Sequence, residues 1–77
     1  MKFLNKEIEH NEYYWLSNSN FRVLARARIE KPQDIEILHF MVMGQSKPIG
    51  TNNIKYITNM NLKKECILDK IKRMLGL

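Results

Sequence analysis

The sequence predicts an α+β fold: a small two-layer sandwich in which a three- or four-stranded antiparallel sheet carries a C-terminal amphipathic helix packed on one face. Three observations support this fold class. Residues 21–30 alternate between apolar and arginine side chains, short turn-forming segments separate the strand-like segments, and apolar residues near the C-terminus recur with helical spacing. At 77 residues, the chain is expected to form one domain, 1–77.

The first twenty residues contain one clear strand. In residues 1–10, Phe3, Leu4 and Ile8 fit a short helix, whereas Phe3 and Ile8 alone fit an irregular strand; we expect a short helix or an extended arm. Residues 12–17 are rich in aromatic side chains, which favour strands. The Ser-Asn-Ser-Asn segment that follows, residues 17–20, is typical of a turn closed by side-chain hydrogen bonds.

Residues 21–30 are expected to form the second strand and residues 34–43 the third, with a proline-containing turn between them. Both connections are short. Because parallel strands need a long crossover, the strands should form an antiparallel meander.

A trial register pairs Leu16 with Phe21 and Ile29 with Glu36, and it separates two faces of the sheet. The apolar face then holds Tyr14, Leu16, Phe21, Val23, Leu38, Phe40 and Val42. The opposite face holds Tyr13, Trp15, Arg22, Arg26, Arg28, His39 and Met41.

The C-terminal third begins with a loop and ends in a helix. Residues 44–53 have loop composition, and residues 54–58 could add a fourth strand. A helix is predicted over residues 62–75, capped by Asn61 and ended by Gly76. Its apolar residues share one arc, which we expect to cover the apolar face of the sheet; they are Ile67, Leu68, Ile71, Met74 and Leu75.

The composition indicates a basic protein with an anionic partner. Hydrophobic residues make up 44% of the chain, which is typical of a folded domain, and the formal net charge is +5. The excess of positive charge lies beyond residue 20. Such a balance favours nucleic acid or the acidic surface of another protein as the partner.

Several other classes of protein are disfavoured by what the sequence lacks. Cys66 is the only cysteine, so no internal disulfide forms, and one cysteine with two histidines is too few for a structural zinc site. The sequence contains no membrane-spanning stretch, no signal peptide and no glycine-rich phosphate loop. We therefore expect a cytoplasmic protein that has no cofactor and no bound metal and does not act at a membrane. Its abundant Lys, Asn and Ile are typical of an AT-rich genome such as that of a bacterium or a phage.

The leading functional hypothesis is that the protein binds RNA or another single-stranded nucleic acid. Aromatic rings stack on bases and cations neutralise phosphates, and both kinds of side chain meet on the arginine-bearing face. The candidate binding residues are Tyr13, Trp15, Arg22, Arg26, Arg28, His39, Lys63 and Lys64. Lys55 is a further candidate for phosphate contact.

The alternative is a protein-binding inhibitor or regulator, of a kind that a phage or mobile element could encode, which docks on an acidic surface of a host protein and can form a homodimer. Tryptophan, tyrosine and arginine dominate protein interfaces, so the same face suits this role too. An enzyme is not expected. His10, Glu12 and His39 are the only plausible acid–base set, and their spacing does not bring them together.

Overall fold

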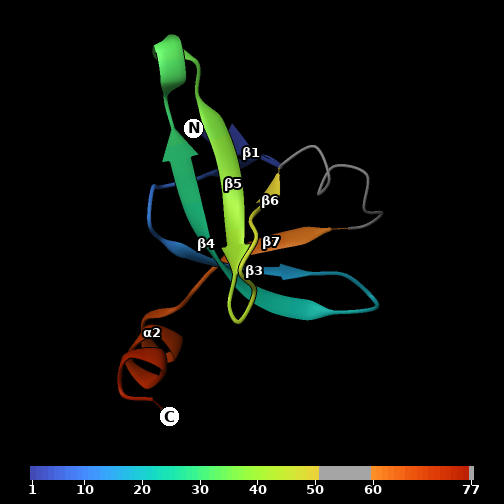
Figure 1. Ribbon diagram of the computed structural model, residues 1–77. Coiled ribbons are helices and arrows are strands. Elements are labelled where there is room, and N and C mark those ends of the chain that lie inside the picture. The colour runs from blue at the N-terminus through green and yellow to red at the C-terminus, as the bar shows by residue number, and fades with distance from the viewer. Residues whose placement is uncertain (51–59, 77) are drawn as a thin grey trace.

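The computed structural model describes residues 1–50 and 60–76, and it confirms the α+β class (Figure 1). Its main sheet has five strands in the order β6-β5-β4-β3-β7, each antiparallel to its neighbours, and a separate two-stranded hairpin precedes it. The helical elements are the 3₁₀ turn η1 (Pro32–Asp34) and the helix α2 (Ile67–Met74). The strands are β1 (Lys2–Phe3), β2 (Lys6–Glu7), β3 (Tyr13–Ser17), β4 (Arg22–Glu30), β5 (Ile37–Val42), β6 (Ile49–Gly50) and β7 (Asn61–Lys64).

The central meander β3–β4–β5 forms as predicted, but both registers are shifted by two residues. Leu16 lies opposite Val23 rather than Phe21, and Ile29 lies opposite Leu38 rather than Glu36. The second shift arises because η1 lengthens the turn between β4 and β5. A shift of two residues keeps every side chain on its face, so the predicted separation into two faces survives.

The core lies on the apolar face of the sheet. Phe40 is fully buried, with its ring centroid 6.0 Å from that of Phe3 and 6.4 Å from that of Tyr14. The other buried side chains are Ile8, Leu16, Ala25, Ala27, Leu38, Val42 and Leu62. Most of them alternate along β3, β4 and β5, as expected of a sheet with one buried face.

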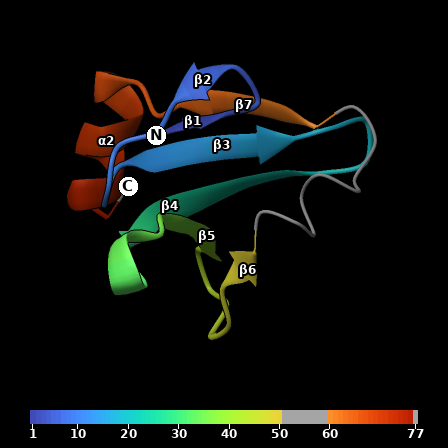
Figure 2. The same cartoon turned by 90° about the horizontal axis from the view of Figure 1, so that it is seen from above.

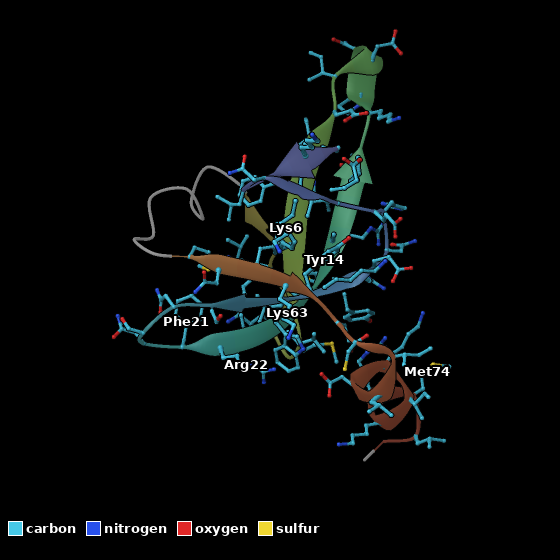
Figure 3. All side chains as sticks on the ribbon, turned by 180° about the vertical axis from the view of Figure 1, so that it is seen from behind. Lys6, Tyr14, Phe21, Arg22, Lys63 and Met74 are labelled. Atoms are coloured by element: carbon cyan, nitrogen blue, oxygen red, sulfur yellow. The ribbon has the colours of Figure 1, made fainter. Side chains whose placement is uncertain are left out.

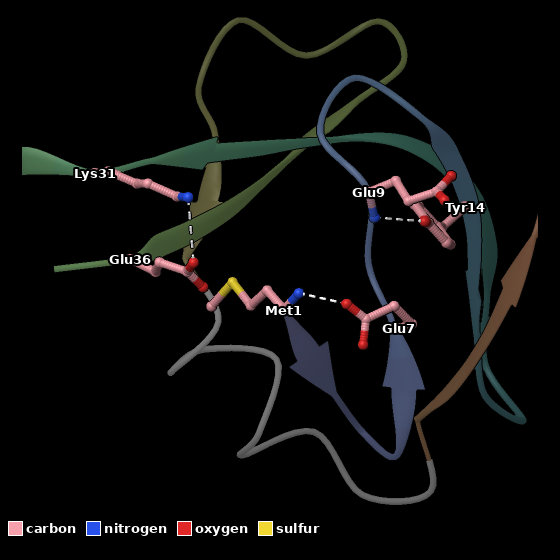
Figure 4. Close-up of polar contacts among 6 residues, drawn as sticks. All are labelled: Met1, Glu7, Glu9, Tyr14, Lys31 and Glu36. Carbon is pink, nitrogen blue, oxygen red and sulfur yellow. Dashed lines mark hydrogen bonds and ion pairs between the residues drawn. The ribbon is translucent and has the colours of Figure 1, made fainter. Parts of the chain in front are cut away.

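The N-terminal segment covers this core as a β-hairpin, so the short helix or extended arm favoured for residues 1–10 does not form, and the irregular strand that was the alternative is nearer to the structure. Its two-residue turn consists of Leu4 and Asn5, both with positive φ, which suits the twist of a tight hairpin. Phe3 and Ile8 enter the core. Figure 4 shows two of the polar contacts that hold the segment: the Met1 ammonium lies 2.6 Å from Glu7 Oε1, and the Glu9 N–H donates to the Tyr14 hydroxyl at 2.9 Å.

The loop predicted over residues 44–53 contains a short strand, and its residues 51–53 lie outside the described residues. Ile49 and Gly50 form the edge strand β6, which pairs with His39 and Phe40 of β5. The strand predicted over residues 54–58, and Lys55 with it, lie outside the described residues.

The C-terminal prediction is wrong in two respects. Residues 61–64 belong to β7, which pairs with β3 and buries Leu62, so the helix begins only after the cap at Cys66. The helix also does not cover the apolar face, because α2 lies beyond the end of the sheet where β7 finishes and β3 begins (Figures 1 and 2). Gly76 has the predicted left-handed conformation, with φ 73°.

The apolar side of α2 faces outward. Met74 points away from the sheet in Figure 3. The exposed fractions of Ile67, Leu68, Ile71, Met74 and Leu75, which we call the α2 stripe, range from 47% to 74%. The N-terminal hairpin occupies part of the place expected for the helix, so the core is closed without the α2 stripe.

Candidate nucleic-acid interface

The alternation of β4 places its arginines together on the face opposite the core. Arg22, Leu24, Arg26 and Arg28 follow one another at every second residue and therefore share a side of the sheet. Neighbouring strands complete a surface that we call the arginine face; it consists of Tyr13, Trp15, Arg22, Leu24, Arg26, Arg28, His39, Met41 and Lys63.

Strand pairing arranges this face in rows that cross the sheet. One row runs from Lys63 through Trp15 to Leu24. The next contains Tyr13, Arg26 and Met41, and a further row pairs Arg28 with His39. Figure 3 shows Lys63 and Arg22 on the side of the sheet where α2 lies, away from Lys6. Cations and rings therefore alternate across the face.

The three β4 arginines have no acidic partner within the described residues. No carboxylate there lies within 4.0 Å of their guanidinium nitrogens. The Nε atoms of Arg26 and Arg28 and the Nε1 of Trp15 are buried without a hydrogen-bond partner. A buried donor without a partner costs about 1–3 kcal/mol. An anion that draws the arginines outward would relieve part of this cost.

A guanidinium group already lies over each of the two aromatic rings of the arginine face. The Arg22 guanidinium carbon lies 3.6 Å from the ring centroid of Trp15, and that of Arg73 lies 3.6 Å from the ring centroid of Tyr13. Such cation–π contacts are worth about 0.5–1 kcal/mol at exposed sites. They orient the rings, and a base stacks either on the remaining ring face or in place of a guanidinium.

Arg73 also fastens α2 to the sheet. Its Nε and Nη2 donate to the two carboxylate oxygens of Glu65 at 3.0 and 3.1 Å. The Glu65 side chain is only 4% exposed. The hydrogen bonds to Glu65 raise the pKa of Arg73, so the guanidinium stays protonated.

We expect that Arg73→Ala loosens α2 without unfolding the sheet. The variant leaves the nearly buried Glu65 carboxylate unpaired and removes the contact with Tyr13, so α2 should open more often. Hydrogen exchange measured by mass spectrometry should show amides of residues 67–74 exchanging at least about tenfold faster, with β3–β5 unchanged. Lys70→Ala, which removes an equal charge from the exposed side of α2, is the control. Equal exchange in both variants would contradict the role of Arg73.

A pocket of about 440 Å³ opens between α2 and the arginine face. Trp15, Leu24 and Met43 contribute its apolar lining, and the C-terminal segment contributes Glu65, Asp69, Lys72 and Arg73. Trp15 is the lining residue that belongs to the eight predicted binding residues, and the sequence did not identify Leu24, Glu65, Asp69, Lys72 or Arg73 as site residues. In the sequence, Asp69 lies at helical spacing from Lys72 and Arg73, a pattern that is common on solvated helix surfaces and so did not indicate a site.

Of the eight predicted binding residues, only Lys64 lies apart. It pairs with Tyr14 of the core face, and its Nζ lies 2.9 Å from Glu9 Oε2. The hydrogen bond with Glu9 raises the pKa of Lys64. Lys63 joins the arginine face, although as a strand residue rather than at the start of a helix.

The two histidines have local partners. His39 Nε2 lies 3.5 Å from Glu30 Oε2, and the His10 Nδ1 accepts a hydrogen bond from the Ile29 N–H at 2.9 Å.

Within residues 1–50 and 60–76, no three His, Cys, Asp or Glu side chains gather in an arrangement that could hold a metal ion. No helix of the described chain is long and apolar enough to cross a bilayer.

The arginine face carries the cations and hydrogen-bond donors of an anion-binding surface. No similarity to a known protein indicates which anion it binds. The chain matches no protein-family model, no curated protein and no solved structure.

Proposed function

We propose that the protein is a non-enzymatic cytoplasmic binding protein that holds single-stranded nucleic acid, RNA foremost, on the arginine face. The observation that carries this proposal is the row of Arg22, Arg26 and Arg28, which share one side of β4 and have no carboxylate partner among the described residues. The phosphate groups of a bound strand would supply the negative partners that these three guanidinium groups lack.

The spacing of the face supports the same proposal. Arg26 and Arg28 are two residues apart, about 6.6 Å along the strand, which is close to the step between phosphates in an extended single strand. Trp15 and Tyr13 lie on the neighbouring strand, where bases that project from such a backbone would reach them. Stacking on an aromatic ring contributes about 1–3 kcal/mol per base and tolerates any sequence.

The test is the salt dependence of binding to a fluorescein-labelled oligouridine, measured by fluorescence anisotropy. Arg22, Arg26, Arg28 and Lys63 are four phosphate contacts, so the logarithm of the affinity should fall against the logarithm of salt concentration with a slope of about −3. Absence of binding at about 50 mM salt, or binding that does not weaken by about 200 mM, would refute the proposal.

A second candidate function is docking on an acidic protein surface, possible for a monomer or a homodimer. The observation that favours a protein partner is the α2 stripe, since five large apolar side chains exposed together are typical of a protein interface. The cations of the neighbouring arginine face suit an acidic one. The discriminating result is a complex that survives moderate salt and is lost when Ile71 and Met74 are replaced by Ser. Light scattering of the purified chain reports whether the stripe pairs with a second copy instead.

A further inference from the structure

We propose that the pocket beside α2 receives one nucleobase of the bound strand and that it selects guanine. This inference rests on the proposed function, because it assigns a base preference to the same surface. Trp15 belongs both to the arginine face and to the pocket lining, so the two sites are continuous.

The pocket has the size and lining that a planar base requires. Its volume of about 440 Å³ lies within the range of small-ligand sites. The indole of Trp15 offers a stacking surface, and Leu24 and Met43 extend the apolar lining. A base seated there would lose water on the face that meets this lining, while its edge meets the polar side chains of α2.

Of the four polar side chains that line the pocket, Glu65 and Arg73 are paired with each other through two hydrogen bonds. The other two are available to a ligand. Asp69 and Lys72 also line the pocket, and no hydrogen bond or ion pair engages either of them among residues 1–50 and 60–76. They lie three residues apart on α2, which places them on the same side of the helix. The pocket thus offers a carboxylate with two acceptor oxygens beside an ammonium donor.

Among the four bases, guanine best matches this pair. Its Watson–Crick edge carries two adjacent N–H donors, N1–H and the N2 amino group, followed by the O6 acceptor. A carboxylate accepts both donors at once, and the ammonium donates to O6. Adenine and cytosine place a ring-nitrogen acceptor beside their amino group, which repels the second carboxylate oxygen. Uracil has a single N–H between two carbonyl groups. Recognition of this edge is available because bases in single strands are unpaired.

The experiment compares four labelled oligouridines of equal length that differ only in the central base: uracil, adenine, guanine or hypoxanthine, which is guanine without the N2 amino group. The guanine strand should bind about tenfold more tightly than the adenine and uracil strands, and hypoxanthine should fall between them. Because hypoxanthine alters the ligand alone, this comparison needs no change to the protein.

Asp69→Asn should abolish the preference for the guanine strand over the uracil strand, because an amide offers one acceptor oxygen and one N–H donor where the carboxylate offers two acceptor oxygens. Glu36→Gln removes one negative charge elsewhere on the surface and is the matched control; it should keep the preference. Circular dichroism melting of each variant verifies folding.

The outcomes separate the two proposals. Equal binding of all four oligonucleotides, or a guanine preference that persists in folded Asp69→Asn, overturns the pocket assignment while the arginine face stands. Failure of every oligonucleotide to bind overturns both proposals.

Discussion

Replacement of Phe40 by alanine is expected to lower the free energy of unfolding by about 3–5 kcal/mol. Phe40 has no exposed surface and its ring meets Phe3 from the N-terminal hairpin and Tyr14 from β3, so alanine would leave a cavity where these segments join. A chain of this length has a total stability of about 4–12 kcal/mol. The variant should therefore lose a large part of that stability, and a thermal melt followed by circular dichroism should show the melting temperature falling by at least about 12 °C.

The contrasting variant is Ile71→Asp in the middle of the α2 stripe. If the helix covered the sheet, as its amphipathic pattern predicted, this charge would be buried and the chain would unfold. In the structure the Ile71 residue is 47% exposed, so we expect a loss of less than about 1 kcal/mol. Unfolding of Ile71→Asp together with a stable Phe40→Ala would show that the arrangement of α2 described above is wrong.

The side chains that share a face of each strand were predictable from the sequence, because this division depends only on the alternation within that strand. Alternation along residues 21–30 fixes which side chains share a face, and a register shift of two residues leaves that division unchanged. That Arg22, Arg26 and Arg28 share one side of β4 therefore needed no knowledge of the turns. The register itself did require that knowledge, since η1 adds residues to the connection between β4 and β5.

The placement of α2 could not be predicted, because an amphipathic pattern shows which side of a helix is apolar but not what it contacts. Leu62 fits a helix and a strand equally well, and it joins β7 because the exposed edge of β3 gains a partner there. Glu65 and Arg73 then hold the polar side of α2 toward the sheet. The pocket depends on this arrangement, so Asp69 and Lys72 could not be assigned to it from the sequence.

Substitution of Arg22, Arg26 and Arg28 together by glutamine is expected to weaken binding of oligouridine by about 3 kcal/mol, roughly 100-fold, at about 1 kcal/mol per lost contact. Glutamine is preferable to alanine because the arginine stems of residues 26 and 28 are half-buried, and a shortened side chain would confuse lost packing with lost charge. The glutamine amide nitrogen takes the place of the arginine Nε along the side chain, so each position keeps a polar group. A circular dichroism melt verifies that the variant stays folded.

The salt dependence separates loss of phosphate contacts from any other cause. Removal of three contacts should reduce the magnitude of the salt slope by about 2, whereas a general misfolding would remove binding at every salt concentration. The control replaces Lys2, Lys6 and Lys47 by glutamine, which removes the same charge from exposed positions outside the arginine face. If this control weakens binding as much as the arginine variant does, net charge rather than the row on β4 attracts the nucleic acid, and the arginine face is not the binding site.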